Sequence, residues 1–246
     1  MKELIIGLSG KANSGKDTVA SMISYIMQVG VTKAKYSEWD IYSKAIKNKY
    51  VDKCKKTIIH FADSLKDCLS IIYNIPRDYF DDRHIKDKMY FSIDEHRLLD
   101  PKDLLNYHTI INNVDLQIKS INEIRNSNKD KKIVLTLRTL MQYFGTDICR
   151  KTFGENVWVD STMRKAGDII LNENYCIIAD VRFKNESDAI KRSAYFGALI
   201  KINRNGIFEY DHESENCNVN YTHVIDNSGS LMSLFYNVLD IIYSII

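Results

Sequence analysis

The sequence contains little of what marks a linker, a zinc module or a disulfide-stabilised protein. Its 246 residues include only two prolines and ten glycines, which argues against long disordered linkers. The five cysteines form no C-x-x-C pair and show no zinc-ligand spacing. Their number is odd and two of them fall in predicted core segments, so we expect free thiols in a reducing cytosol and a cytoplasmic protein. The cysteines are Cys54, Cys68, Cys149, Cys176 and Cys217.

Neither an excess of one charge nor a long apolar run is present. The formal net charge is only +2, which gives no bulk electrostatic reason to bind nucleic acid or a membrane. The apolar stretch 231–246 contains Asp240 and has 16 residues, too few to span a bilayer. Its leucines and isoleucines recur at helical spacing and predict a closing helix packed on a sheet. No signal peptide is expected, because the apolar start leads into a glycine-containing loop.

That loop is the most informative segment of the sequence. Residues 10–18 read Gly-Lys-Ala-Asn-Ser-Gly-Lys-Asp-Thr and follow the apolar run 4–8 directly. The spacing Gly-x4-Gly-Lys between a strand and an amphipathic helix is typical of a P-loop, whose backbone N–H groups surround a phosphate chain. A glycine turn between a core strand and a core helix is the weaker alternative. The predicted nucleotide-binding residues are Gly10, Ala12, Asn13, Ser14, Gly15, Lys16, Asp17 and Thr18.

Apolar runs and helical periodicity alternate along most of the sequence. Strands are predicted at 4–8, 57–61, 175–179, 198–202 and 222–225, and helices at 16–28, 64–73, 137–151, 156–171, 186–196 and 230–244. This order predicts an α/β fold with a parallel sheet and helices on both faces. We expect a single domain over 1–246, with 78–132 as an insertion over the active-site face that holds weak helices at 101–108 and 114–125.

A carboxylate and an arginine follow the predicted strand at 175–179. Asp180 stands where the acidic residue of a Walker B strand would hold Mg²⁺ or one of its waters. Arg182 is close enough in sequence to neutralise phosphoryl oxygens during transfer. For Asp180 alone, the alternative is a residue that caps the next turn.

A second candidate group lies between residues 138 and 160. Arg138 and Gln142 share one face of the predicted helix, so an arginine fork for phosphate and an amide for a base edge would point the same way. Gly145 and Thr146 are expected to break or cap that helix. Trp158 is either a core aromatic or a platform for a base. Without further context, the solvated-surface and core alternatives are the more common ones.

Six segments together resemble the deoxynucleoside monophosphate kinases of tailed bacteriophages. They are residues 14–18 (Ser-Gly-Lys-Asp-Thr), 61–66 (Phe-Ala-Asp-Ser-Leu-Lys), 142–146 (Gln-Tyr-Phe-Gly-Thr), 153–160 (Phe-Gly-Glu-Asn-Val-Trp-Val-Asp), 180–186 (Asp-Val-Arg-Phe-Lys-Asn-Glu) and 225–231 (Ile-Asp-Asn-Ser-Gly-Ser-Leu). The resemblance implies the three-layer nucleoside monophosphate kinase fold. It also implies conversion of deoxynucleoside monophosphates to diphosphates with ATP and Mg²⁺, in the host cytoplasm if the protein is viral, and it is compatible with a homodimer.

The resemblance assigns roles to individual residues. It places Lys16, Asp17 and Thr18 on Mg²⁺-ATP, with Asp17 and Asp180 at the metal, and explains why an aspartate follows the P-loop lysine. Lys16, Arg138, Asp180 and Arg182 would be catalytic. The acceptor nucleotide would contact Arg138, Gln142, Gly145, Thr146, Trp158, Asp160, Arg182 and Glu186. Two residues depart from the family pattern: Lys184 replaces a common proline, and Thr139 replaces a common second basic residue.

Two other functions stay open at this point. The first is a P-loop kinase for another small phosphorylated acceptor, such as phosphomevalonate, which the glutamine and tryptophan disfavour. The second is a nucleotide-binding or ATPase module that acts on nucleic acid, which the absence of basic stripes disfavours. We therefore expect small-molecule partners, with no nucleic acid and no membrane.

Overall fold

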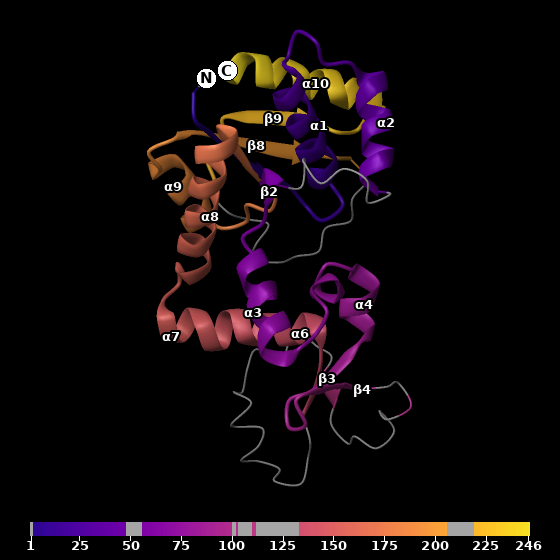
Figure 1. The fold of residues 1–246 in the computed structure, drawn as a ribbon, viewed down its shortest axis with the longest axis vertical. Helices are drawn as coiled ribbons and strands as arrows, with labels where there is room; N and C mark the ends of the chain where they lie inside the picture. Colours follow the sequence, from indigo (N-terminus) through magenta and orange to yellow (C-terminus); the bar gives the residue numbers. More distant parts are fainter. Residues whose placement is uncertain (1, 48–55, 100–101, 103–109, 112–132, 206–218) are drawn as a thin grey trace. The chain divides into compact units, whose positions relative to one another are not determined.

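A computed structural model describes residues 2–47, 56–99, 102, 110–111, 133–205 and 219–246 (Figure 1). The chain forms two compact units. Unit 1 comprises Met1–Phe61 and Val159–Ile246, and unit 2 comprises Ala62–Trp158. Unit 2 includes the predicted insertion 78–132 and extends beyond it on both sides.

Unit 1 is built on a five-stranded parallel sheet, as the alternation of strands and helices predicts. The strand order is β2-β7-β1-β8-β9, which places the N-terminal strand at the centre. In the register, Ile6 of β1 lies beside Ile177 of β7 and Ala198 of β8. The strands are β1 (Leu4–Ser9), β2 (Ile58–Ile59), β7 (Tyr175–Ile178), β8 (Phe196–Asn203) and β9 (His223–Asp226).

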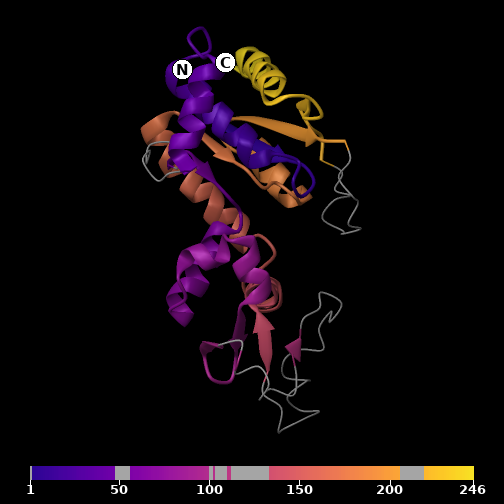
Figure 2. The same cartoon turned by 90° about the vertical axis from the view of Figure 1, so that its right-hand side faces the viewer.

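Helices cover both faces of this sheet (Figures 1 and 2). Side chains alternate along β1, so that Leu4 and Ile6 pack with one group of helices and Ile5 with the other. On the first face lie α1 (Lys16–Val29), α2 (Tyr36–Lys47) and α10 (Leu231–Ile245), and on the second α8 (Val157–Glu173) and α9 (Lys184–Arg192). The predicted α/β fold with a three-layer arrangement is confirmed.

Helix α2 was not predicted, and its buried face is aromatic. Trp39 is only 3% exposed, and its indole nitrogen donates a hydrogen bond to Ser21 on α1. Tyr36 and Trp39 both pack against Phe235 of α10, with ring centroids about 6 Å apart. Helix α9 also differs from the prediction, because it ends at Arg192 rather than at 196. Ser193 adopts an extended conformation there, and its hydroxyl donates to the carbonyl of Ile190.

Unit 2 holds a second sheet that was not predicted. Its strand order is β4-β3-β6-β5, with β3 antiparallel to β4 and β6, and β5 parallel to β6. The predicted helices at 101–108 and 114–125 lie almost entirely outside the described residues. The elements of unit 2 are α3 (Asp63–Tyr73), a 3-10 helix η2 (Arg77–Phe80), α4 (Arg83–Lys88), β3 (Tyr90–Ser92), β4 (Arg97–Leu99), β5 (Ile110–Ile111), β6 (Val134–Thr136), α6 (Leu137–Gln142), a π-helix η4 (Tyr143–Arg150) and α7 (Lys151–Phe153).

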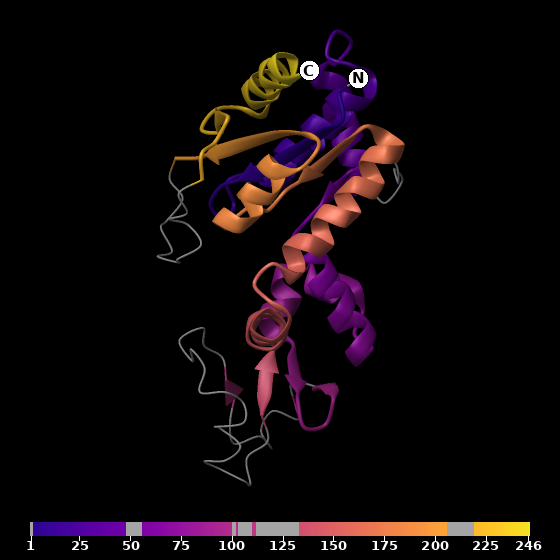
Figure 3. The ribbon, with the colours of Figure 1, turned by 90° about the vertical axis from the view of Figure 1, so that its left-hand side faces the viewer.

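The elements α6, η4 and α7 form one continuous helix, which Figure 3 shows nearly end-on. It begins at Leu137 and is capped by Thr136, whose side chain accepts a hydrogen bond from the N–H of Thr139. The helix predicted at 137–151 is confirmed, but Gly145 and Thr146 neither break nor cap it. Gly145 lies inside the π-helical segment and packs against Leu65 of α3. A Cβ atom at Gly145 would lie 2.8 Å from a methyl carbon of Leu65, so the glycine allows close packing of the two helices.

Two expectations from composition concerned free cysteines and membrane-spanning helices. Among the described residues, Cys68, Cys149 and Cys176 are unpaired thiols, whereas Cys54 and Cys217 lie outside the described residues. None of the described helices combines the length and the apolar character that a membrane crossing requires.

Candidate functional site

The loop after β1 has the backbone conformation of a phosphate-binding loop. Asn13 and Gly15 both have positive φ angles, +63° and +97°. At Gly10, which also has a positive φ, a Cβ atom would lie 2.6 Å from the carbonyl oxygen of Ile202. Only glycine tolerates both the backbone angle and this close approach of β8. The turn therefore depends on the glycines that the sequence motif predicted.

Lys16 reaches back over this loop from the first turn of α1. Its ammonium group donates hydrogen bonds to the carbonyl oxygens of Gly10 and Lys11, at 2.6 and 2.8 Å. A cation held across the mouth of the loop is placed to neutralise phosphate oxygens there. The helix that follows adds the positive end of its dipole.

Two residues far along the sequence hold the loop from outside. The side-chain amide of Asn227, in the turn after β9, donates to the carbonyl of Ser14 at 2.8 Å. The guanidinium group of Arg204, just after β8, donates to the carbonyl of Asn13 at 3.3 Å. The Ser14 hydroxyl is buried and has no hydrogen-bond partner among the described residues. Asn227 lies in one of the segments that carried the family resemblance, but no role was predicted for it.

A cavity of about 370 Å³ opens between this loop and the end of β8. Five of its lining residues are cationic, and no aspartate or glutamate appears among the described residues that line it. Such a wall suits a polyanion. The lining includes Lys16 and Arg182, which were predicted, and Lys201, Arg204 and Tyr221, which were not. The lining residues are Ser9, Gly10, Lys11, Ala12, Lys16, Val181, Arg182, Lys201, Ile202, Asn203, Arg204, Asn205 and Tyr221.

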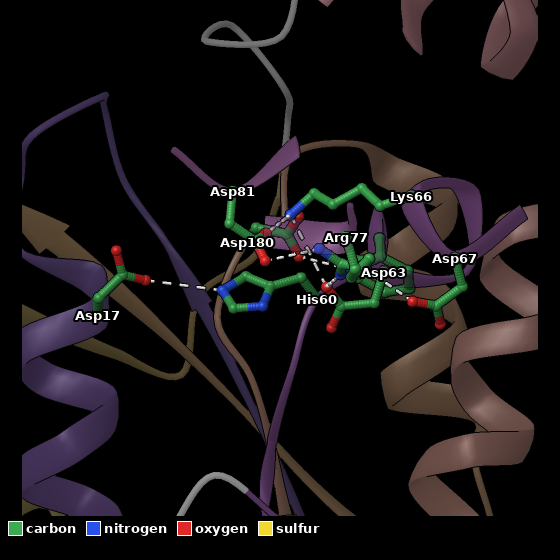
Figure 4. A network of polar contacts seen from close by, with 9 residues as sticks. Asp17, His60, Asp63, Lys66, Asp67, Arg77, Asp81 and Asp180 are labelled. Atoms are coloured by element: carbon green, nitrogen blue, oxygen red, sulfur yellow. Dashed lines mark hydrogen bonds and ion pairs between the residues drawn. The ribbon is translucent and has the colours of Figure 1, made fainter. Parts of the chain in front are cut away.

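The two predicted metal-binding carboxylates belong to elements that flank the loop. Asp180 follows β7, the neighbour of β1, and one of its oxygens accepts the N–H of Phe61 at 2.8 Å. Asp17 is 90% exposed and lies 3.6 Å from the imidazole of His60, as Figure 4 shows. The described residues contain no group of three or more metal-ligating side chains. One or two carboxylates completed by substrate phosphates and water are the usual protein ligands of Mg²⁺, so these residues fit that ion.

Arg182 and Glu186 were both predicted near the reaction centre, and they differ in environment. Arg182 is exposed, lines the cavity and has no side-chain hydrogen bond or ion pair among the described residues. Glu186 is only 3% exposed, and its carboxylate accepts the N–H groups of Arg182 and Phe183. Glu186 therefore fixes the backbone that carries Arg182. Asp160, on α8, is exposed.

The remaining predicted acceptor residues lie in unit 2. Arg138, in the first turn of α6, forms a two-pronged ion pair with Asp87 of α4. Gln142 and Thr146 are exposed on the continuous helix. Trp158 is 8% exposed and packs in the core of unit 2. Its ring nitrogen donates to the carbonyl of Gly145 at 3.0 Å, so its hydrogen-bonding capacity is used within the protein.

The segment 61–66 leads to a network of ion pairs that sequence reasoning missed. Arg77 donates to Asp63, Asp67 and Asp81 at distances of 2.9, 2.7 and 2.6 Å (Figure 4). Lys66 is a second partner of Asp81, at 2.8 Å. Burial alone would raise the pKa of Asp81, but the hydrogen bonds from Arg77 and Lys66 outweigh it and lower the pKa below its ordinary value. The network joins α3 to η2.

The P-loop on the central strand of a parallel sheet, with an aspartate just after the adjacent strand, defines the class of P-loop nucleotide-binding proteins. Comparison with known families narrows this class. A family model described as deoxynucleotide monophosphate kinase matches residues 4–238. The chain belongs to this family of kinases.

Two viral relatives agree with this assignment. The Escherichia phage T5 protein named deoxynucleoside-5′-monophosphate kinase is 22% identical over 240 residues, which cover 86% of this chain and 84% of the phage protein. A protein of Acanthamoeba polyphaga mimivirus, provisionally named deoxynucleotide monophosphate kinase, is 35% identical over 111 residues. That match covers 41% of this chain and only 56% of the mimivirus protein.

Proposed function

We propose that this protein transfers the γ-phosphoryl group of Mg²⁺-ATP to deoxynucleoside 5′-monophosphates and releases the diphosphates. The observation that carries the proposal is the P-loop cavity. Its wall combines Lys16 and Arg182 with three further cations, and Asp180 follows the strand next to the loop. Membership of the deoxynucleotide monophosphate kinase family supports the choice of acceptor.

In this proposal unit 1 binds the donor nucleotide. The N–H groups of residues 10–18 surround the phosphate chain, and the Lys16 ammonium exchanges its loop carbonyls for phosphate oxygens. Asp17 and Asp180 would hold Mg²⁺, which supplies charge neutralisation on the donor phosphates when bound. His60 would orient the Asp17 carboxylate, because the two side chains lie 3.6 Å apart.

The acceptor residues fall into two groups by their environment. Gln142, Thr146 and Asp160 are exposed, and we assign them direct contacts with the acceptor nucleotide. Trp158, Gly145 and Glu186 are buried, so they would shape the acceptor site rather than hydrogen-bond to the nucleotide. Arg138 would bind phosphate after exchanging its contact with Asp87.

The chemistry needs little acid–base help from the protein. The acceptor phosphate is already anionic at pH 7, so it can attack the γ-phosphorus in line without a strong general base. Positioning and charge neutralisation supply most of the rate enhancement. Because Arg182 is exposed and its side chain forms no hydrogen bond or ion pair with the described residues, it can turn toward the transferred group. Its loss should cost about 3–4 kcal/mol in the transition state.

An ADP-release assay tests the function. Purified protein with Mg²⁺-ATP is supplied in turn with each deoxynucleoside monophosphate, the matching ribonucleotides, phosphomevalonate and DNA. We expect ADP formation that depends on one or more deoxynucleoside monophosphates. Release stimulated only by phosphomevalonate or only by DNA would replace the proposal with one of its two alternatives.

Two variants test the role of Arg182 in the same assay. Arg182→Ala should lower kcat a few hundredfold while the circular dichroism spectrum is unchanged. Arg192→Ala is the matched control, because Arg192 is an exposed arginine on α9 outside the cavity lining. Turnover by Arg182→Ala equal to that of the control would remove Arg182 from the mechanism.

Three further expectations belong to the proposal. Small molecules are the partners, so DNA should not affect turnover. The homodimer suggested by the family resemblance is tested by measuring the molar mass of the protein by light scattering as it elutes from a size-exclusion column. A cytoplasmic location is tested by fractionation of cells that express the chain.

A further inference from the structure

Three cationic side chains of unit 2 come from three different helices. They are Lys66 on α3, Lys86 on α4 and Arg138 on α6. Lys66 pairs with Asp81, and Arg138 pairs with Asp87. Lys86 is half-buried, yet its ammonium forms neither a hydrogen bond nor an ion pair with the described residues. No role has been assigned to Lys86 so far.

The backbone holds Lys86 and Arg138 near each other. Helix α4 is capped by Asp82, whose carboxylate accepts the N–H groups of His84 and Ile85. At the other end of α4, the carbonyl of Met89 accepts the N–H of Leu137, the residue before Arg138. The Arg138–Asp87 ion pair joins the same two helices through side chains. The position of Lys86 is therefore fixed by the surrounding structure.

The charges around Lys86 are unbalanced. Burial lowers the pKa of the Lys86 ammonium, and repulsion from Arg138 and Lys66 lowers it further, while Asp87 and Asp81 offset only part of the effect. Both carboxylates already serve another cation. A half-buried ammonium that faces two cations is stabilised when an anion is bound beside it.

We propose that Lys86, together with Lys66 and Arg138, binds the phosphate monoester of the acceptor nucleotide. A phosphate dianion offers three terminal oxygens and two charges, which match an arginine fork and two point-charge lysines. Lys66 and Arg138 are already paired, so Lys86 supplies the ammonium that no described carboxylate engages. This assignment rests on the proposed function and adds a specific phosphate contact to it.

Steady-state kinetics of three variants test the assignment. Lys86→Gln should raise the KM for deoxynucleoside monophosphate about ten- to a hundredfold, as expected for loss of a charged hydrogen bond, and leave the KM for ATP within about twofold. Lys86→Arg should recover much of the loss. Lys88→Gln is the matched control, because it removes the same charge from an exposed position on the same helix.

Thermal unfolding separates a binding role from a structural one. Removing a repelled cation should leave the melting temperature of the free protein equal or raised, while the stabilisation by deoxynucleoside monophosphate should shrink. A lowered melting temperature with an unchanged ligand-induced shift would show that Lys86 is structural. The same titration with the unphosphorylated deoxynucleoside should not distinguish Lys86→Gln from wild type, because that ligand has no phosphate.

The outcomes distinguish the two proposals. If the wild-type protein phosphorylates deoxynucleoside monophosphates and Lys86→Gln keeps the wild-type KM, the phosphate assignment is wrong and the function stands. If no such substrate is turned over, the function is wrong. The anion site is then decided with inorganic phosphate in a Lys16→Met background, which removes the P-loop cation. If phosphate raises the melting temperature equally in this background with Lys86 and with Lys86→Gln, the assignment is wrong.

Discussion

The contact between Asn227 and the P-loop allows a quantitative test of how the loop is held. Gly15 has a φ of +97°, and a Cβ atom there would clash with the side-chain nitrogen of Asn227. The same nitrogen donates to the carbonyl of Ser14. Gly15→Ala should therefore perturb both the backbone conformation and this hydrogen bond. Asn227→Ala removes the clash in advance, so the two substitutions should not be additive.

The sizes of these effects follow from the contacts. A left-handed conformation costs an L-residue such as alanine about 1–2 kcal/mol, and overpacking costs a further 1–3 kcal/mol. Loss of the Asn227 hydrogen bond costs about 1 kcal/mol. In the double variant only the backbone strain and the lost hydrogen bond remain. We expect it to be at least about 1 kcal/mol more stable than the sum of the single effects.

Urea unfolding followed by tryptophan fluorescence measures these free energies. The sequence has two tryptophans, Trp39 in unit 1 and Trp158 in unit 2. A protein with two units need not unfold in one transition. A Trp158→Phe background leaves Trp39 as the reporter of the unit that contains the P-loop. Asn220→Ala, at an exposed position in unit 1, is the control for loss of an asparagine.

Additivity within about 0.5 kcal/mol would refute the reasoning. It would mean that Asn227 and Gly15 do not interact and that the turn after β9 does not hold the loop. ATP binding provides a second readout. If Asn227 fixes the carbonyl of Ser14, Asn227→Ala should raise the KM for ATP, and the Asn220→Ala control should not.

Three further predictions concern other parts of the molecule. Lys16→Met should lower acceptor-dependent ADP release about 10²- to 10³-fold with an unchanged circular dichroism spectrum; near-normal release would remove Lys16 from phosphate binding. Arg77→Met should destabilise unit 2 by about 1–2 kcal/mol at pH 7, since exposed pairs are individually weak but here share one guanidinium. Because the pKa of Asp81 is lowered in the folded protein, the stability that its ion pairs contribute is present above the ordinary carboxyl pKa and is lost as the pH falls below about 3.8. The difference in unfolding free energy between wild type and Arg77→Met should therefore shrink over that pH range. A difference that stays constant would contradict the network. Burial raises the pKa of Cys176 to about 12, so at pH 8 iodoacetamide should modify the half-buried Cys68 well before Cys176, as mass spectrometry can follow.

Unit 1 could be predicted from the sequence because its signals are local. Each strand is a short apolar run, and α1 and α10 show aliphatic residues at helical spacing. Helix α2 was not predicted because its buried face is made of Tyr36, Trp39 and Tyr42 among polar residues, rather than of leucine or isoleucine. An aromatic at every third position was the signal that could have revealed it.

Some residues of the candidate site could likewise be predicted from local sequence, and others could not. The P-loop, Asp180 and Arg182 were predictable because each lies within a few residues of a strand end. Arg204 and Asn227 contact the loop only because the parallel register brings the ends of β8 and β9 beside the end of β1, where Ser9 pairs with Lys201. Spacing along the sequence cannot reveal such contacts. They could have been predicted only if the order of the strands in the sheet had been known.

Unit 2 resists prediction for a physical reason. Its strands have two or three residues, too few to show a period, and the pairing of β3 with β6 joins residues 42 to 46 positions apart. Arg138 and Asp87 are separated by 51 residues, so nothing in the local sequence links them. The two cations near Lys86, Arg138 and Lys66, are therefore brought there by tertiary structure. If that cluster binds the acceptor phosphate, the donor half of the reaction is encoded locally and the acceptor half by long-range contacts. Substitutions in the β3–β6 pairing should then alter the KM for the acceptor before they alter the KM for ATP.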